Sequence, residues 1–155
     1  MKRTIVVLFL LAMTIASAAQ QHHPYKCTNE TGKGHYGYSC SGVAPNPLDG
    51  FATEPFAAYG VVTGDGKGQW GGYGKVSFNG KLIVPWTHKT RPYGPSIVNP
   101  DCTGSVTYEV TVGGTSVPDA HFDFVIVNSG QEIKGFPTDA GYAVVCQLIQ
   151  LSDDR

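Results

Sequence analysis

His121 and Asp123 are the residues best suited to acid–base chemistry, and they lie two positions apart in the segment "HFDFVIV". Alternate side chains of a β-strand point to the same face, so an imidazole and a carboxylate at this spacing lie side by side. Such a pair could act as a general base with its orienting carboxylate, and Glu109 on the preceding strand could join them. The sequence favours the alternative, in which these three residues face solvent while Phe122 and Phe124 point inward.

A set of aromatic residues could instead form the apolar wall of a ligand site. Alternation along the fourth predicted strand puts Leu82, Val84, Trp86 and His88 on one face. Similar apolar faces occur on the neighbouring segments, and the predicted wall consists of Trp70, Trp86, Tyr108, Phe122 and Phe124. Such faces either fill a small barrel completely or enclose one small ligand, and both interpretations stay open.

Other kinds of chemistry find little support in the sequence. No G-x-S-x-G segment is present, and "GDGKG" is typical of a hairpin turn because no helical pattern follows it. The formal net charge is -1 and there is no basic stripe, which argues against nucleic acid or an anionic membrane surface as a partner. We therefore expect no cofactor and no nucleic-acid or membrane partner.

The first residues have the pattern of an export signal. Lys2 and Arg3 precede a short apolar run and the small residues "ASAAQ", which predicts a signal peptide over residues 1–19. Cleavage after Ala19 would put His22 in third place, where it could help bind Cu(II) in a square plane. The new N-terminal glutamine can cyclise and remove the free amine, so we expect residues 20–33 to be a disordered lead-in without a metal.

All four cysteines lie in the exported part, at positions 27, 40, 102 and 146. An even number of cysteines in a secreted chain predicts two disulfides. Zinc is the alternative, but none of the four forms a C-x-x-C pair and no histidine lies at ligand spacing from them. Three pairings remain open from the cysteines alone.

After residue 33 the chain reads as a series of hairpins. Short alternating segments rich in Val, Ile, Thr, Tyr and Phe are separated by Gly, Asn and Asp, which is typical of an all-β domain. The "NG" at Asn79-Gly80 is the strongest turn signal, and residues 43–55 are predicted to be a proline-rich loop. The expected strands are 34–42, 56–63, 68–78, 81–90, 96–99, 105–112, 120–127, 131–136 and 142–151.

Short connections between these segments predict an antiparallel meander. A meander of about eight strands removes its exposed edges by closing, so we predict a closed up-and-down barrel over residues 34–151 with a tail at 152–155. A Greek-key sandwich is the alternative. Closure would set the first strand beside the last, which favours Cys40–Cys146 and leaves Cys27 to pair with Cys102, given Cα atoms about 5.5 Å apart.

Three segments also resemble a known group of proteins: "YGVVTGDGKGQWGGYGKVSFNGKL", "NPDCTGSVTYEV" and "HFDFVIVNSGQEIKGFPTDAG". Their turns resemble those of a mostly uncharacterised family of small secreted bacterial proteins. That family is similar to the allene oxide cyclase barrel, a calycin-like fold of eight antiparallel strands. The resemblance covers residues 27–151 and implies a barrel with one ligand-sized cavity. It carries no catalytic residue to a position of this sequence.

Three functions are consistent with these observations. The first is a secreted module that binds a small apolar molecule in the barrel. The second is an isomerase or cyclase, suggested only by the resemblance to allene oxide cyclase, and the third is a structural or interaction protein with a filled barrel. Whether the chain is an enzyme therefore depends on whether a titratable side chain lies in a cavity.

Overall fold

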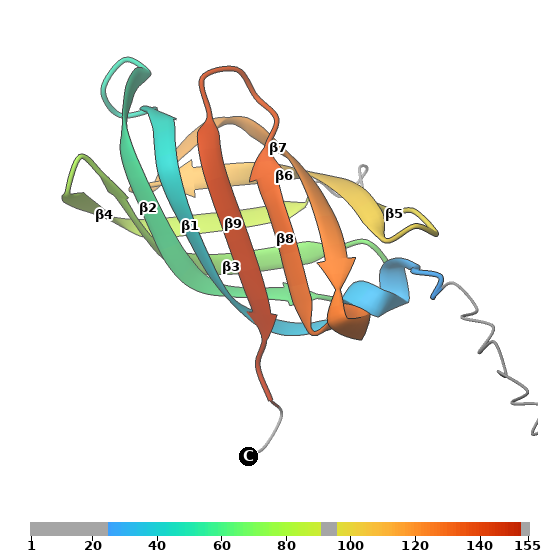
Figure 1. Cartoon of the computed structure of the whole chain (residues 1–155). Coiled ribbons are helices and arrows are strands. Elements are labelled where there is room, and N and C mark those ends of the chain that lie inside the picture. The colour runs from blue at the N-terminus through green and yellow to red at the C-terminus, as the bar shows by residue number, and fades with distance from the viewer. Residues whose placement is uncertain (1–24, 91–95, 153–155) are drawn as a thin grey trace, which may run out of the picture.

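The structure, a computed structural model, describes residues 25–90 and 96–152, and its regular elements are almost all strands. The predicted signal peptide and His22 lie outside the described residues. Figure 1 labels the strands, which are β1 (Gly34–Asn46), β2 (Ala52–Gly64), β3 (Trp70–Phe78), β4 (Lys81–Thr90), β5 (Ile97–Val98), β6 (Thr103–Val112), β7 (Thr115–Val127), β8 (Glu132–Pro137) and β9 (Ala143–Gln150). Two 3-10 helices, η1 (Asn29–Gly32) and η2 (Asn128–Gly130), complete the described elements.

The strands form a closed antiparallel barrel with up-and-down order. Hydrogen-bonded neighbours follow the order β4-β3-β2-β1-β9-β8-β7-β6, and pairing of β4 with β6 closes the ring. The short strand β5 pairs with the beginning of β6. Figure 1 shows β1 and β9 side by side at the seam between the two ends of the chain. The predicted closed barrel is therefore confirmed, and the Greek-key sandwich is not what forms.

Two disulfides brace the barrel, and both follow the pairing that closure favoured. Cys40 and Cys146 are cross-strand partners on β1 and β9, and they are bonded with their Cα atoms 4.1 Å apart. Cys27 is bonded to Cys102 in the turn after β5. Disulfides persist in oxidising compartments, so the bonds indicate an extracytoplasmic setting. Within the described part of the chain, no helix is long and apolar enough to cross a membrane.

The proline-rich segment predicted as a loop is mostly strand. β1 continues to Asn46 and β2 begins at Ala52, so that Pro45 pairs with Thr53 and Val43 with Pro55. Pairing of β1 with β9 ends at Val43, so Pro45 lies where β1 has a neighbour on one side only. A proline is tolerated at such an edge because its missing N–H would not have met a partner there. The proline content of this segment therefore does not exclude strands, because the prolines lie at an edge of the sheet.

The predicted face of the fourth strand is wrong in its first half. Gly74 pairs with Trp86 and Val76 with Ile83, so the two residues Val84 and Pro85 lie opposite Lys75 alone. This bulge reverses the alternation. Leu82 and Val84 are consequently 56% and 52% exposed, and Ile83 packs against the core instead. Proline favours such a bulge because it cannot donate to the strand ladder.

One end of the barrel is packed solid. Tyr36 is fully buried, its ring lies 5.7 Å from that of Trp70, and its hydroxyl donates to the Gly130 carbonyl oxygen at 2.9 Å. The Trp70 indole N–H donates to the Ser96 hydroxyl at 2.9 Å. Gly32 of η1 lies against Trp70, and a Cβ there would meet the indole ring. Part of the expected lead-in, from Cys27 onward, is therefore ordered as a cover over this end.

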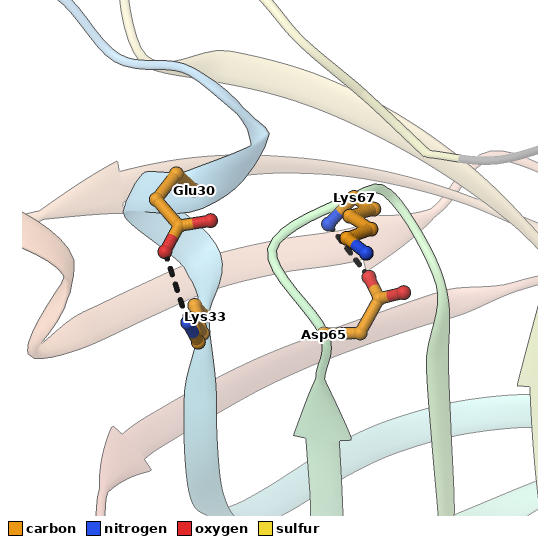
Figure 2. A network of polar contacts seen from close by, with 4 residues as sticks. All are labelled: Glu30, Lys33, Asp65 and Lys67. Carbon is orange, nitrogen blue, oxygen red and sulfur yellow. Dashed lines mark hydrogen bonds and ion pairs between the residues drawn. The ribbon is translucent and has the colours of Figure 1, made fainter.

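The cover lies close to the β2–β3 turn, and each of the two segments has polar contacts of its own. Figure 2 shows the ion pair between Lys33 and Glu30 beside the turn that contains Asp65 and Lys67. Lys33 Nζ lies 3.1 Å from Glu30 Oε1. Asp65 accepts hydrogen bonds from the backbone N–H groups of Lys67 at 2.7 Å and Gln69 at 2.9 Å. The turn approaches Glu30 so closely at Gly66 that a Cβ there would clash with the carboxylate.

Candidate functional site: a cavity in the open half of the barrel

The other half of the barrel contains a cavity of about 130 Å³. Residues from the β1–β2 loop, from the start of β7 and from the β8–β9 loop surround it, and these segments meet at the same end of an antiparallel barrel. The lining is aromatic and aliphatic, and the Cys40–Cys146 disulfide forms part of it. Among the described residues that line this cavity there is no Asp, Glu, Lys or Arg, so its wall is apolar with a few neutral polar groups.

Four rings form a continuous cluster in this wall. His88 on β4 is at the centre, with its ring centroid 5.4 Å from Tyr38, 5.3 Å from Trp86 and 5.2 Å from Tyr108. The two tyrosine rings meet the imidazole nearly at right angles, at 81° and 83°. Edge-to-face contact of this kind is favourable because a ring edge is positive and a ring face is negative. The four side chains therefore form one packed unit between β1, β4 and β6.

Glycines on the inner faces of β2 and β3 make room for this cluster. A Cβ at Gly60 or Gly74 would collide with the Tyr38 hydroxyl oxygen, and a Cβ at Gly72 would lie 2.8 Å from His88 Nε2. These glycines therefore leave space inside the barrel. The space is occupied in part by rings that reach across from β1 and β4.

Burial keeps the titratable groups of the cluster neutral. It lowers the pKa of His88 to about 4, because a charged imidazolium would lose its hydration. Burial raises the pKa of Tyr108 far above its ordinary value. For Tyr38, burial is again the main cause of a strongly raised pKa, and the nearby Tyr108 adds to it. At neutral pH the cluster therefore offers two phenol hydroxyls and an uncharged imidazole, and Tyr142 adds a third phenol to the wall.

Three of the five aromatic residues predicted to form the wall do line the cavity. Trp86, Tyr108 and Phe122 are in the lining, whereas Trp70 and Phe124 are not. Trp70 belongs to the packed end. Phe124 is buried, and its phenyl ring packs against Gly104, so that a Cβ at position 104 would meet the ring. Alternation correctly predicted that both point inward. It could not predict their depth, which depends on strand tilt and on the cover formed by η1.

The three acid–base candidates lie outside the cavity lining. His121 is exposed, and its Nδ1 lies 2.7 Å from Oδ1 of Asp139, a residue of the β8–β9 loop. Glu109 pairs with Lys89 at 3.3 Å on the outer surface, and Asp123 is exposed beside Phe122 and Phe124, which face inward. The structure therefore does not bring the three together, and the predicted inward and outward faces of β7 are as observed.

Sequence reasoning missed two of the polar residues in the wall. Tyr38 alternates with Tyr36 and Cys40 in "HYGYSC", and His88 alternates with Trp86, so their inward direction was readable. Their close packing in the cavity wall could not be predicted, because it depends on glycines on other strands that let the rings approach. Among the described residues, no group of three or more His, Cys, Asp or Glu side chains gathers in a way that could hold a metal ion.

Comparisons with known proteins do not add a family. No family model, curated protein or solved structure matches the chain. The likeness to the allene oxide cyclase barrel that the turn motifs predict therefore stays a prediction. Function must be argued from the cavity itself.

Proposed function

We propose that the protein is an exported binding module that holds a small, mainly apolar molecule in the barrel cavity. The observation that carries this proposal is the cavity of about 130 Å³ with its aromatic lining. Protein interiors are close-packed, and a void of this size sacrifices dispersion contacts along its whole wall. Such a loss is expected where binding of a ligand restores the contacts.

The size of the cavity limits the ligand. Drug-sized molecules occupy pockets of roughly 300–1,000 Å³, which is well above the volume here. An apolar cavity of roughly 150 Å³ in another protein binds benzene or xenon. We infer a ligand with about one ring, or a short branched chain, as its apolar body.

Export of the protein rests on two separate observations. The two disulfides favour an oxidising compartment. The first 19 residues have the charge, apolar run and small-residue cleavage site of a secretory signal. Together they support a periplasmic or extracellular location.

The two other functions have less support. An isomerase or cyclase would need a titratable side chain against its substrate. The candidates His121, Asp123 and Glu109 lie outside the cavity lining, whereas Tyr38, His88 and Tyr108 lie in it. Burial shifts the pKa values of these three groups toward their neutral forms, so the wall has no charged acid or base, and His88 with its pKa lowered to about 4 is a weak base. A structural protein with a filled barrel would not need the void. The binding function therefore has the better support, and it requires no chemistry from the wall.

Benzene is the probe that tests this proposal, with binding followed by the chemical shifts of methyl groups in the barrel. We expect saturable binding, abolished by Val110→Phe, which fills the cavity, and kept by Val145→Phe on the outer surface of β9, where Val145 is 70% exposed. Absence of saturable binding to the unaltered protein, or equal binding by both variants, would contradict the proposal.

A further inference from the structure

Two polar atoms in the wall of the cavity have no hydrogen-bond partner among residues 25–90 and 96–152. Tyr38 Oη and His88 Nδ1 are both buried, and neither has a hydrogen bond with any described residue. Both side chains line the cavity. Buried polar atoms in folded proteins are nearly always paired, because an unpaired one forfeits its hydration without compensation. Two of them in one ring cluster point to a group that is supplied from outside the chain.

The fold places these two side chains in the same part of the wall although their strands are not neighbours. β1 and β4 are separated by β2 and β3, and the rings of Tyr38 and His88 meet across the barrel interior at 5.4 Å. Gly60 and Gly74 leave the space that the Tyr38 hydroxyl occupies. The Tyr38 hydroxyl lies against Gly60 and Gly74, and both atoms are buried, so a ligand in the cavity reaches them when the Tyr38 and His88 rings turn toward it.

The chemistry of the two atoms defines the group that they would bind. A protonated tyrosine hydroxyl donates a hydrogen bond, and a neutral imidazole nitrogen accepts or donates according to its tautomer. A hydroxyl on the ligand satisfies both, because it accepts from Tyr38 and can either donate to His88 or accept from it. A carboxylate or an ammonium group does not fit, because no Asp, Glu, Lys or Arg is among the described residues that line the cavity.

We propose that the ligand is an uncharged, hydroxyl-bearing molecule with a body of about one ring, such as a small phenol, and that Tyr38 and His88 bind its oxygen. This inference rests on the proposed binding function and specifies the ligand class. Benzene and phenol differ by one hydroxyl, so together they separate the apolar cavity from the polar subsite.

The test compares the dissociation constants of phenol and benzene at pH 7 in three proteins. Tyr38→Phe removes one oxygen from the cavity wall. Tyr36→Phe is the matched control, because it removes the same atom from the packed end, where Tyr36 bonds to Gly130 and is not part of the lining. We expect Tyr38→Phe to weaken phenol about tenfold and to change benzene by less than about twofold. Tyr36→Phe should leave the ratio of the two constants unchanged.

A second variant keeps the test decisive. His88→Leu removes the imidazole nitrogens with a side chain of similar size, and we again expect a selective loss of phenol binding. If the unaltered protein binds benzene but not phenol, the hydroxyl subsite is refuted while the binding function stands. An equal loss of both ligands in Tyr38→Phe also refutes the subsite. If the unaltered protein binds neither ligand, the proposed binding function is contradicted, and the hydroxyl subsite that rests on it is contradicted as well.

Discussion

The surroundings of His88 disfavour the charged form of its side chain. It lies among three other aromatic rings and above Gly72, in a wall where burial lowers its pKa from 6.5 to about 4. The folded protein therefore binds a proton on His88 less readily than the unfolded chain does. Between these two pKa values the unfolded state holds more protons, so stability falls as the pH falls.

We expect the free energy of unfolding to decrease between pH 6.5 and pH 4 because of this one group. A difference from 6.5 to about 4 corresponds to up to about 3 kcal/mol, at about 1.4 kcal/mol per pKa unit. The contribution is fully present above pH 6.5 and is lost by about pH 4. Urea unfolding at a series of pH values, for the unaltered protein and for His88→Leu, measures it.

The comparison with His88→Leu isolates the imidazole from the acidic groups. The carboxyls of Asp65, Asp101 and Glu132 also have lowered pKa values in the folded protein, and they destabilise it as they become protonated. They are present in both proteins and cancel in the difference. Parallel curves for the two proteins between pH 6.5 and pH 4 would show that His88 is not buried as the structure has it.

At the scale of elements, turn chemistry was the most readable part of the sequence. The β3–β4 turn forms at Asn79 and Gly80, which have φ values of 47° and 79°, the left-handed conformation that this dipeptide adopts at low cost. Prolines were misleading, because Pro45 and Pro55 lie within paired strands and Pro85 lies in a bulge. A proline is tolerated in a strand where its nitrogen faces no neighbouring strand. The local sequence does not show how many strands lie beside a given position, so it could not predict where a proline is tolerated.

The β8–β9 loop is the element that connects the surface to the cavity. Asp139 accepts hydrogen bonds from the backbone N–H of His121 at 2.8 Å, and its other oxygen lies 2.7 Å from the imidazole Nδ1. The same loop leads to Tyr142, which lines the cavity. The exposed His–Asp pair thus has a clear structural role: it attaches the loop to β7 beside the cavity.

We expect Asp139→Ala to loosen this loop without unfolding the barrel. Both hydrogen bonds disappear, and each contributes about 1 kcal/mol, so the amides around Tyr142 should exchange with solvent up to about thirtyfold faster. Hydrogen exchange followed by NMR measures this. Asp101→Ala is the matched control. Asp101 accepts two similar hydrogen bonds, from the backbone N–H and the hydroxyl of Thr103, in the turn between β5 and β6. Unchanged exchange at Tyr142 in Asp139→Ala would contradict the role of the pair.

At the scale of the whole molecule, closure of the barrel could be predicted from the sequence, whereas the arrangement of the barrel interior could not. Regular hairpins made a closed barrel the expected way to remove edges, and closure in turn favoured the observed disulfides. The division of the interior into a packed end and a cavity was not readable. It depends on the cover formed by η1 over Trp70 and on three glycines that receive rings from distant strands. These are contacts between segments far apart in the sequence.

The seam between β1 and β9 shows how the disulfides should act. The two strands are already paired along the seam from Tyr36–Gln150 to Val43–Ala143, so Cys40–Cys146 adds little order to the folded barrel. Its effect is expected mainly in the unfolded chain, whose freedom it restricts. In this chain-entropy model the stabilisation by a disulfide depends on the logarithm of the length of the loop that it closes. The two disulfides close loops with sequence separations of 106 and 75, so their expected stabilisations are nearly equal.

We therefore expect the two double variants, Cys40→Ala with Cys146→Ala and Cys27→Ala with Cys102→Ala, to lose similar amounts of stability. Each should lower the free energy of unfolding by about 2–5 kcal/mol, and the chain-entropy model puts the difference between them below about 1 kcal/mol. Guanidinium unfolding monitored by circular dichroism measures both values, and the unaltered protein under oxidising conditions is the reference. A much larger loss for the Cys40 and Cys146 pair would mean that this bond holds the seam and the cavity wall together in the folded barrel. In that case benzene binding should weaken in the same variant, because the disulfide lines the cavity.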